Sequence, residues 1–298
     1  MRKMPLENLD LVRKTCLKNL DLVRKQEDKM KKIMTVFLAL LLPLAACTGT
    51  SAQAEKNSVK AEQNQAQASE SVQEKTETEK EETVKNAKAK LLYMGHASLR
   101  ITTAEGKVIY IDPFVGEGYE PAADLILVTH AHHDHNAVDK IKNRNEGHKI
   151  ITWKEALADG KHQTFDLGYV KIEAVEAGYN KNHDVKECVG YILTLSDGVT
   201  VYVSGDTSKT KQMPALAEKK LDYAFYCCDG VYNMDLPEAA ECAKLVGAKH
   251  DIPYHVIAAS GGKYFDRERA EQFDSPNRLV IGEGEEIELV SDSGNQKN

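Results

Sequence analysis

Short apolar runs bounded by Gly, Asp and Pro fill the chain from about residue 89 onward. Their length and their content of Val, Ile, Leu and Tyr are typical of β-strands. Three stretches, at 209–219, 236–246 and 264–273, instead repeat apolar residues with helical spacing, and 154–158 is a shorter one of the same kind. Strands are predicted at 90–94, 98–102, 107–111, 124–129, 149–152, 169–177, 189–195, 199–204, 222–227, 251–254, 278–281 and 286–290.

Strand clusters flanked by helices predict an α/β fold in which one sheet packs on another and helices lie outside. A segment of about 200 residues, 89–298, is enough for one such domain. The apolar pattern by itself does not separate this sandwich from other α/β folds.

The chain before residue 89 has a different composition. Residues 1–29 contain a near repeat, in which 17–25 resembles 6–14, and they contain no aromatic residue. Two such copies bury little apolar surface. We interpret them as an upstream extension from a misplaced start codon, with a pair of short amphipathic helices as the alternative.

Residues 30–47 have the three parts of a secretory signal. A positively charged start at 30–32 precedes an apolar stretch at 33–42, which is too short to span a bilayer, and small residues lead to Cys47. The segment resembles a bacterial lipoprotein signal, which implies an extracytoplasmic protein attached to the cell membrane by a lipid on Cys47. A buried core helix with a stray Cys is the alternative.

Residues 48–88 consist mainly of Glu, Lys, Gln, Ala, Ser and Thr, without an aromatic residue. Such a segment cannot bury enough apolar surface to offset its ordering entropy, so we predict a disordered tether with a reach of roughly 35 Å. The chain has a net charge of −7, and its folded part has no basic stretch for phosphate contacts. Nucleic acid is therefore not expected as a partner.

The candidate chemistry lies directly after the buried strand predicted at 124–129. His130 and His132 are two residues apart, so in an extended segment both imidazoles leave the same side of the backbone and can converge on one ion. Asp134 and His135 follow at the predicted start of a helix capped by Asn136 and point elsewhere, so two ions fit better than one. A loop that is rich in His by chance is the alternative.

This His-x-His-x-Asp-His motif resembles the signature of the metallo-β-lactamase-fold hydrolases. Stretches at 94–99, 110–114, 204–207 and 252–255 resemble further motifs of that family, in the same order, so that the resemblance covers about 90–290. It implies a four-layer αββα sandwich in a single domain. It also implies hydrolysis by a hydroxide that bridges two metal ions, without a Ser or Cys nucleophile.

Other candidate ligands lie further along the chain. Asp206 ends a strand at a Gly turn and His255 ends a short strand, so both side chains can reach a site beyond the sheet edge. A helix-capping Asp and a half-buried His are the alternatives. The resemblance implies one more His before Asp206, where His148, His162 and His183 all lie. We expect His183, which stands in a loop resembling the Ala-Tyr-Asn loop of the family, and expect the other two at surface turns.

The resemblance therefore implies a complete ligand set. Nitrogen and carboxylate donors without a thiolate fit Zn²⁺, with Mn²⁺ and Fe²⁺ as alternatives. Such ions lower the pKa of the bridging water and polarise the bond to be cleaved. We expect catalytic roles for Asp134 and Asp206. One ion would be held by His130, His132 and His183 and the other by Asp134, His135 and His255, with Asp206 and the hydroxide between them.

Two further groups of residues are open to more than one interpretation. His96 follows the first strand and either supports the metals or lies at a plain surface turn. Three tyrosines could orient a substrate or be ordinary core and rim residues. They are Tyr179, Tyr232 and Tyr254. A separate expectation concerns the cysteines of the folded part, which should be buried thiols: Cys188, Cys227, Cys228 and Cys242.

The expected substrate is a small ester, lactone or phosphoester, because the motifs resemble most closely those of the lactonase and phosphodiesterase-like branch. The alternative is a non-catalytic metal-binding or surface-interaction lipoprotein that keeps the fold. Short loops at 116–121, 178–186, 229–235 and 260–263 are expected to wall the site and leave no domain to grip a polymer. The possible charge partners for an anionic or polar substrate are Lys181, Lys186 and Lys263.

Overall fold

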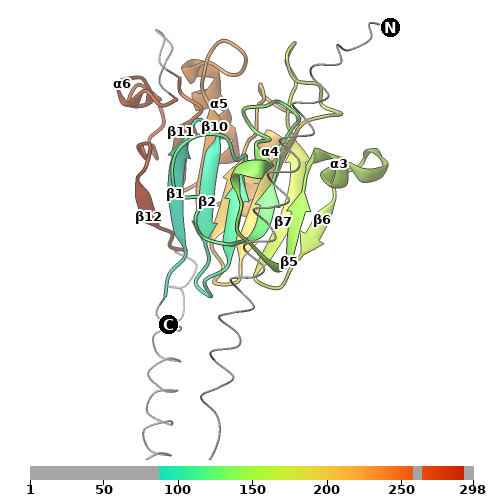
Figure 1. Cartoon of the computed structure of the whole chain (residues 1–298). Coiled ribbons are helices and arrows are strands. Elements are labelled where there is room, and N and C mark those ends of the chain that lie inside the picture. Colours follow the sequence, from blue (N-terminus) through green and yellow to red (C-terminus); the bar gives the residue numbers. More distant parts are fainter. Residues whose placement is uncertain (1–86, 258–263, 292–298) are drawn as a thin grey trace, which may run out of the picture. The chain divides into compact units, whose positions relative to one another are not determined.

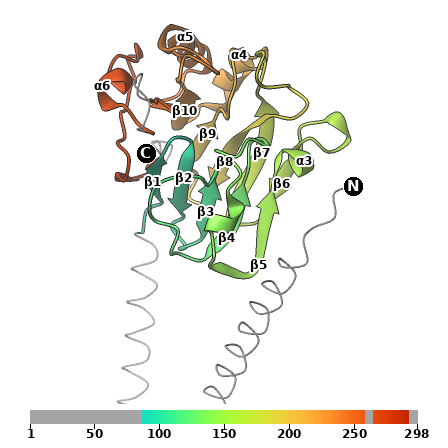
Figure 2. The same ribbon diagram turned by 45° about the horizontal axis from the view of Figure 1, so that its top comes forward.

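Two mixed sheets of six strands each stack face to face in the computed structural model (Figures 1 and 2). The structure describes residues 87–257 and 264–291, which belong to one structural unit of the chain, 72–298. The expectations for the extension, the signal, nearly all of the tether, the loop 260–263 and Lys263 lie outside these residues. The α/β sandwich expected for the folded part is confirmed.

The first sheet has the order β12-β1-β2-β3-β4-β5. Pairing is antiparallel from β12 to β3 and parallel from β3 to β5. Its strands are β1 (Lys90–Gly95), β2 (Ser98–Thr102), β3 (Val108–Ile111), β4 (Ala123–Leu127), β5 (Arg144–Ile151) and β12 (Glu286–Glu288).

The second sheet has the order β11-β10-β9-β8-β7-β6 and is built in the same way. The pairs β9–β10 and β10–β11 are parallel, and the others are antiparallel. Because the carboxyl ends of parallel strands meet at one edge of a sheet, the segments after β3, β4, β9, β10 and β11 lie together. The strands are β6 (Thr164–Asp166), β7 (Val170–Glu176), β8 (Val189–Leu195), β9 (Thr200–Val203), β10 (Tyr223–Cys227) and β11 (His250–Tyr254).

Helices are few and short in the described part. The longest is α5 (Leu236–Val246), which packs on β10, is capped by the Asp235 side chain at its start and ends at Gly247 in the left-handed conformation. No described helix is long and apolar enough to cross a membrane. The others are α3 (Trp153–Ala156), α4 (Met213–Leu216) and α6 (Arg267–Ala270), with 3₁₀ turns η1 (Val138–Lys140), η2 (Ala158–Gly160) and η3 (Ala217–Lys219).

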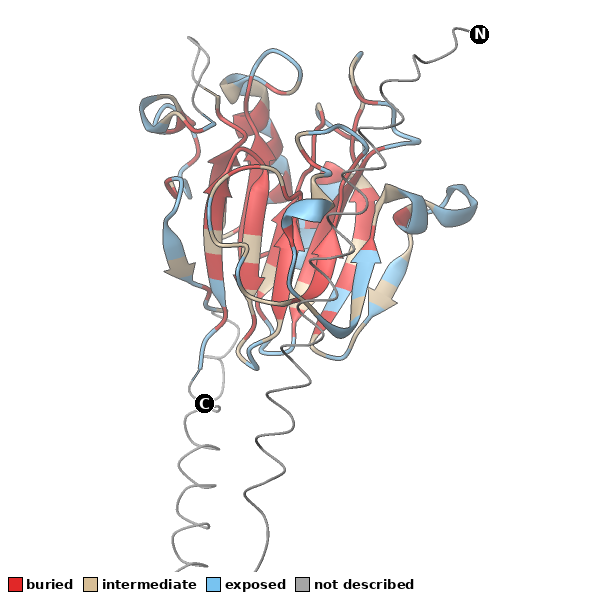
Figure 3. Cartoon of the chain, viewed as in Figure 1, coloured by how far each residue is buried: buried red, intermediate tan, exposed pale blue. Residues whose placement is uncertain are grey.

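Alternate residues of β1 show how the core is divided. Leu91 and Tyr93 belong to the main hydrophobic cluster, which contains residues of both sheets. Met94 belongs to a smaller hydrophobic cluster on the outer face of the first sheet. Loop residues such as Ile141 and Tyr119 cover this second cluster. Figure 3 shows that the central strands are buried while the edge strands β5, β6 and β12 are largely exposed.

Some predicted elements differ from the structure. The strand at 278–281 is wrong, since Arg278 forms only an isolated bridge with Asp251. The helix after Asn136 is only the turn η1, which has no side-chain cap. The helix at 209–219 is reduced to α4 and η3. Pro214 lacks an N–H and would interrupt a helix that begins at 209, but it is tolerated in the first turn of α4. The helix at 264–273 is reduced to α6. β6 and the polar first half of β5 were missed because they lack an apolar run.

Candidate metal centre

The predicted ligands converge at the edge of the sandwich where the parallel strands end. Their donor atoms form groups in which all atoms lie within 4.8 Å of one another. One group, which we call the first position, consists of His130, His132 and His183. Another, the second position, consists of His96, Asp134, His135 and His255. A third group connects these two and consists of His130, His135 and Asp206.

The first position joins two neighbours in the chain to a loop from the other sheet. His130 Nε2 lies 3.0 Å from His132 Nδ1, and the ring of His183 lies 5.1 Å and 4.9 Å from their ring centroids. Thr129 Oγ1 donates to a carboxylate and therefore accepts from His130 Nδ1 at 3.0 Å. Asn180 Oδ1 accepts from His183 Nδ1 at 3.1 Å. Both contacts keep the proton on Nδ1, so that Nε2 carries the lone pair with which an imidazole binds a cation.

A tight loop brings His183 to this place. Gly178 has φ +88°, and a Cβ there would lie 2.8 Å from His183 O, so only glycine allows the loop to close. Asn180 and His183 form an isolated bridge across the turn, and Gly178 bridges to Thr207 beside β9.

The histidines of the second position are all buried, whereas the first position includes the exposed His132. His135 is fully buried, and its Nδ1 donates to Asp112 Oδ2 at 2.8 Å. His255 Nδ1 lies 3.6 Å from Asp229 Oδ2. The Nε2 atoms of both histidines have no hydrogen-bond partner in the described part of the chain. Carboxylates thus stand behind these imidazoles, where the first position has neutral oxygens.

Asp206 lies between the two positions. Its Oδ1 is 3.4 Å from His135 Nε2, and its Oδ2 is 3.4 Å from His183 Nε2 and 3.6 Å from His255 Nε2. Asn233 Nδ2 donates to Oδ2 at 2.7 Å. The preceding Gly205 has φ +61°, and a Cβ there would lie 2.7 Å from a backbone oxygen of β8, so glycine is needed to aim this carboxylate.

The electrostatics of the two positions differ as well. Burial and the neighbouring His135 lower the pKa of His130, and burial lowers the pKa of His183. Burial opposes protonation of His135 too, but Asp206 and Asp112 raise its pKa well above the usual value. Burial raises the pKa of Asp206, but His255 and His135 hold it well below its usual range.

Several buried polar atoms in the centre have no hydrogen-bond partner among the described residues. Among them are Nε2 of His135, His183 and His255 and Oδ1 of Asp206, and Nδ1 of His96 and of His255 lacks a described partner too. Such orphaned atoms are rare in protein interiors, because each costs free energy unless something binds it. Here they converge, and their nitrogen and carboxylate chemistry suits a divalent cation, so these residues fit a metal.

Most of the residues that hold the ligands were not recognised from the sequence, although a supporting role was one of the two interpretations of His96. Asp112 ends β3 beside the strand that carries the main motif, and this position at a parallel strand end was the available signal. His96 is only 5% exposed and its Nε2 lies 3.1 Å from Asp134 Oδ2, so its interpretation as a plain surface turn is wrong. The other supporting residues missed were Thr129, Asn180, Asp229 and Asn233.

The remaining histidines lie elsewhere. His148 belongs to β5, not to the expected turn, and His162 is exposed before β6. Neither belongs to a described group of metal-binding side chains. The prediction of buried thiols is confirmed for all four cysteines of the folded part, which are free: Cys188, Cys227, Cys228 and Cys242.

Comparison with known proteins agrees with this centre. Residues 90–255 match the family model described as a beta-lactamase superfamily domain. The chain belongs to this superfamily. A UPF0173 metal-dependent hydrolase of Lysinibacillus sphaericus is 32% identical over 193 residues, which are 56% of this chain and 84% of that protein. A second one, from Pyrococcus furiosus, is 31% identical over 192 residues, with the same shares covered. This superfamily member is therefore a metal-dependent hydrolase of the UPF0173 family.

Solved structures show the same fold. A protein from Parabacteroides distasonis has 29% identity and a TM-score of 0.53, and the match covers 63% of this chain and 90% of that one. A metallo hydrolase from Ignicoccus hospitalis has 23% identity and a TM-score of 0.52, covering 67% and 98%. The metallo-β-lactamase fold expected from the motifs is thus confirmed.

Exposed apolar side chains stand around the metal centre of this hydrolase. Val231 and Tyr232 are 63% and 56% exposed, in the loop between Asp229 and Asn233. Asn182 Nδ2 donates to Tyr232 O at 3.0 Å and ties this loop to the one that carries His183. An exposed Val and an exposed Tyr therefore lie in the loop that also carries Asn233, which donates to Asp206. Of the two other tyrosines considered, Tyr254 is fully buried in the core and Tyr179 is partly buried.

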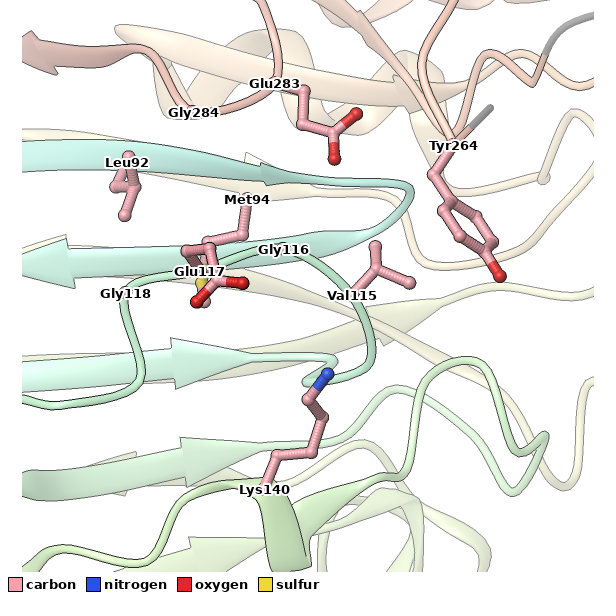
Figure 4. A pocket seen from close by; sticks show the side chains of 10 residues that line it. All are labelled: Leu92, Met94, Val115, Gly116, Glu117, Gly118, Lys140, Tyr264, Glu283 and Gly284. Atoms are coloured by element: carbon pink, nitrogen blue, oxygen red, sulfur yellow. The ribbon is translucent and has the colours of Figure 1, made fainter. Parts of the chain in front are cut away.

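A cavity on the outer face of the first sheet is separate from the ligands. It has a volume of about 660 Å³, with Leu92, Met94 and Val115 as its apolar wall (Figure 4). Residues 116–118, expected to wall the metals, line this cavity instead. Tyr264 stands at its end with its ring 5.7 Å from that of His96. No predicted ligand lines the cavity, so it is not the place of reaction.

Proposed function

We propose that this hydrolase holds two divalent cations, with Zn²⁺ the best fit, and cleaves a small ester, lactone or phosphoester. The observation that carries the proposal is the place of Asp206, whose two oxygens face imidazoles of both positions. One cation would be held by the first position and the other by Asp134, His135 and His255. A shared carboxylate between two groups of imidazole nitrogens favours two cations over one.

The roles of the residues follow from their contacts. The cations, when bound, supply an activated water and polarise the bond to be cleaved. Asp112 and Thr129 keep the protons of His135 and His130 on Nδ1, so that both Nε2 atoms face the centre. Asn233 holds one oxygen of Asp206 and so sets the direction of the carboxylate.

The rim supports a small substrate with an apolar part next to the bond that is cleaved. Val231 and Tyr232 offer that contact beside Asp206 and His255. Lys181 and Lys186 are exposed on the neighbouring loop and stay candidates for a charged end of the substrate. A polymer such as a nucleic acid is not proposed, because the short loops offer little surface to grip it.

A metal analysis of the purified chain, combined with a substrate panel, tests this function. The panel contains a lactone, a phosphodiester, a phosphomonoester and a thioester. We expect about two cations per chain and turnover of one class that stops after chelation and returns with Zn²⁺. Turnover that survives complete chelation would contradict the mechanism. Bound metal without turnover on any class would favour the non-catalytic metal-binding lipoprotein.

We also propose that the protein is exported and attached to the bacterial membrane by a lipid on Cys47. The support is the order of charged, apolar and small residues at 30–47. Cys47→Ala should release the protein from the membrane fraction or leave it unprocessed, whereas the matched variant Cys16→Ala should stay membrane-bound. Wild-type protein found in the cytosol with Met1 intact would refute this proposal.

A further inference from the structure

We infer that His96 is a positioning residue of the second position, which holds Asp134 and His255 in place without binding the cation itself. The inference rests on the proposed two-cation function. It concerns a histidine that lies outside the main motif and whose role the sequence left open.

The backbone of His96 is fixed in an unusual conformation. The residue has φ +54° in the turn between β1 and β2, a left-handed conformation that is uncommon for residues other than Gly. Its N–H donates to Tyr264 O at 3.0 Å, and its carbonyl oxygen accepts from Tyr93 OH at 2.9 Å and from the N–H of His255 at 2.8 Å. These contacts compensate for the strain and attach the backbone of His255 directly to that of His96.

The side chain of His96 contacts the same two ligands. Its Nε2 lies 3.1 Å from Asp134 Oδ2, and its ring centroid lies 3.6 Å from that of His255. Asp134 stands in the loop after β4 and His255 follows β11 in the other sheet. His96 therefore connects two ligands that come from different sheets.

The hydrogen-bond pattern distinguishes a positioning role from a ligand role. The imidazoles of His130, His135 and His183 each have an oxygen acceptor at Nδ1, which suits a histidine that binds metal through Nε2. His255 Nδ1 has no hydrogen bond in the described part of the chain, but the Asp229 carboxylate faces it at 3.6 Å. Nδ1 of His96 is buried and has no partner among the described residues. A buried N–H without an acceptor is costly, so the proton belongs on Nε2, where it is donated to Asp134.

This donation restrains the Asp134 carboxylate. One oxygen, Oδ2, is held by His96, which restrains the rotamer of the carboxylate. No described hydrogen bond or ring contact joins His96 to the residues of the first position. Loss of His96 should therefore weaken one of two binding events and leave the other unchanged.

Titration of Zn²⁺ into the metal-free, full-length protein by calorimetry tests the inference. His96→Leu and His96→Gln share the cost of a non-glycine residue at φ +54°, but only Gln supplies an N–H donor, so the pair isolates the hydrogen bond. We expect His96→Leu to weaken one of the two events by about 10 to 100-fold and His96→Gln to recover part of that loss. Asn180→Leu should weaken the other event, and His148→Gln should change neither.

The outcomes separate this inference from the proposed function. A wild-type protein that binds only one Zn²⁺ contradicts the two-cation function. If the wild type binds two and His96→Leu binds both with unchanged affinity, the positioning role is overturned while the function stands. If His96→Leu and His96→Gln lose one ion equally and completely, while circular dichroism shows the native fold, His96 is a ligand and the inference is wrong.

Discussion

The two positions of the metal centre lie side by side but are supported differently. In the first, neutral oxygens of Thr129 and Asn180 stand behind the imidazoles, and His132 is exposed. In the second, the carboxylates of Asp112 and Asp229 stand behind fully or almost fully buried imidazoles.

This difference has consequences for metal binding. A carboxylate behind a histidine fixes its tautomer and raises its basicity more than a neutral oxygen does, so it strengthens the bond to a cation. Exposure has the opposite effect, because water and chelators can reach the ligand. We therefore expect the second position to bind its cation more tightly and the first to exchange more readily.

Replacing the shared carboxylate should have the largest effect. Asp206→Asn removes a charge that faces both positions, so we expect weaker binding of both cations and a loss of turnover greater than about 100-fold, more than an outer partner contributes. Metal content and initial rates measure this. The exposed Asp159→Asn serves as control. A variant that keeps one cation at wild-type affinity would show that Asp206 belongs to a single position.

Removing a charged outer partner should have a smaller effect, mainly at the second position. Asp112 is fully buried and accepts from Thr129 N, Thr129 Oγ1 and His135 Nδ1. Asp112→Asn should weaken one Zn²⁺ event by about 10 to 100-fold and lower the free energy of unfolding by about 1–3 kcal/mol. Calorimetry and urea unfolding of the metal-free protein check the two parts. Equal weakening of both events would remove the distinction between the positions.

Graded chelation should remove the cation of the first position before the cation of the second. As the chelator concentration rises, we expect one cation to leave before the other, giving a protein with one metal per chain. His132→Ala should lack the easily removed cation and keep the other, because the exposed His132 belongs only to the first position. Metal analysis after dialysis measures this. Loss of both cations in a single step would argue against unequal affinities.

The smallest expected difference between the two positions is the number of protons released when each binds its cation. Asp206 and Asp112 raise the pKa of His135, so in the metal-free protein this imidazole keeps its proton at neutral pH, whereas burial keeps His130 neutral. Loading of the second position should then release about one proton that loading of the first does not. Calorimetry in two buffers with different ionisation enthalpies measures the release, and equal release at both events would contradict it.

The sign of the pH dependence follows from the same shift. A histidine with a raised pKa stabilises the metal-free fold below its ordinary pKa, and this contribution disappears as the pH rises through the raised value. The stability of the metal-free protein should therefore fall on that alkaline side. The affinity of the second position should rise over the same range, because the cation no longer competes with a proton.

Local sequence determined most of the strands and the direction of two ligands of the metal centre. Most strands of both sheets could be predicted from short apolar runs, since a run of that length between turn residues has few other structures. The spacing of His130 and His132 at a strand end likewise predicted that both face one place, because side chains alternate along an extended backbone. The edge strand β6 and the false strand at 278–281 show where the apolar pattern is too weak.

Only the tertiary structure decided which distant residues meet. Three histidines lie between the motif and Asp206, and the loop closed at Gly178 brings His183 to the centre while His148 stays on an edge strand. His96 and Asp134 are 38 residues apart, and His255 reaches them from the second sheet. Periodicity reports which face of its own element a residue occupies. It carries no information about contacts between elements, which depend on how the two sheets pack.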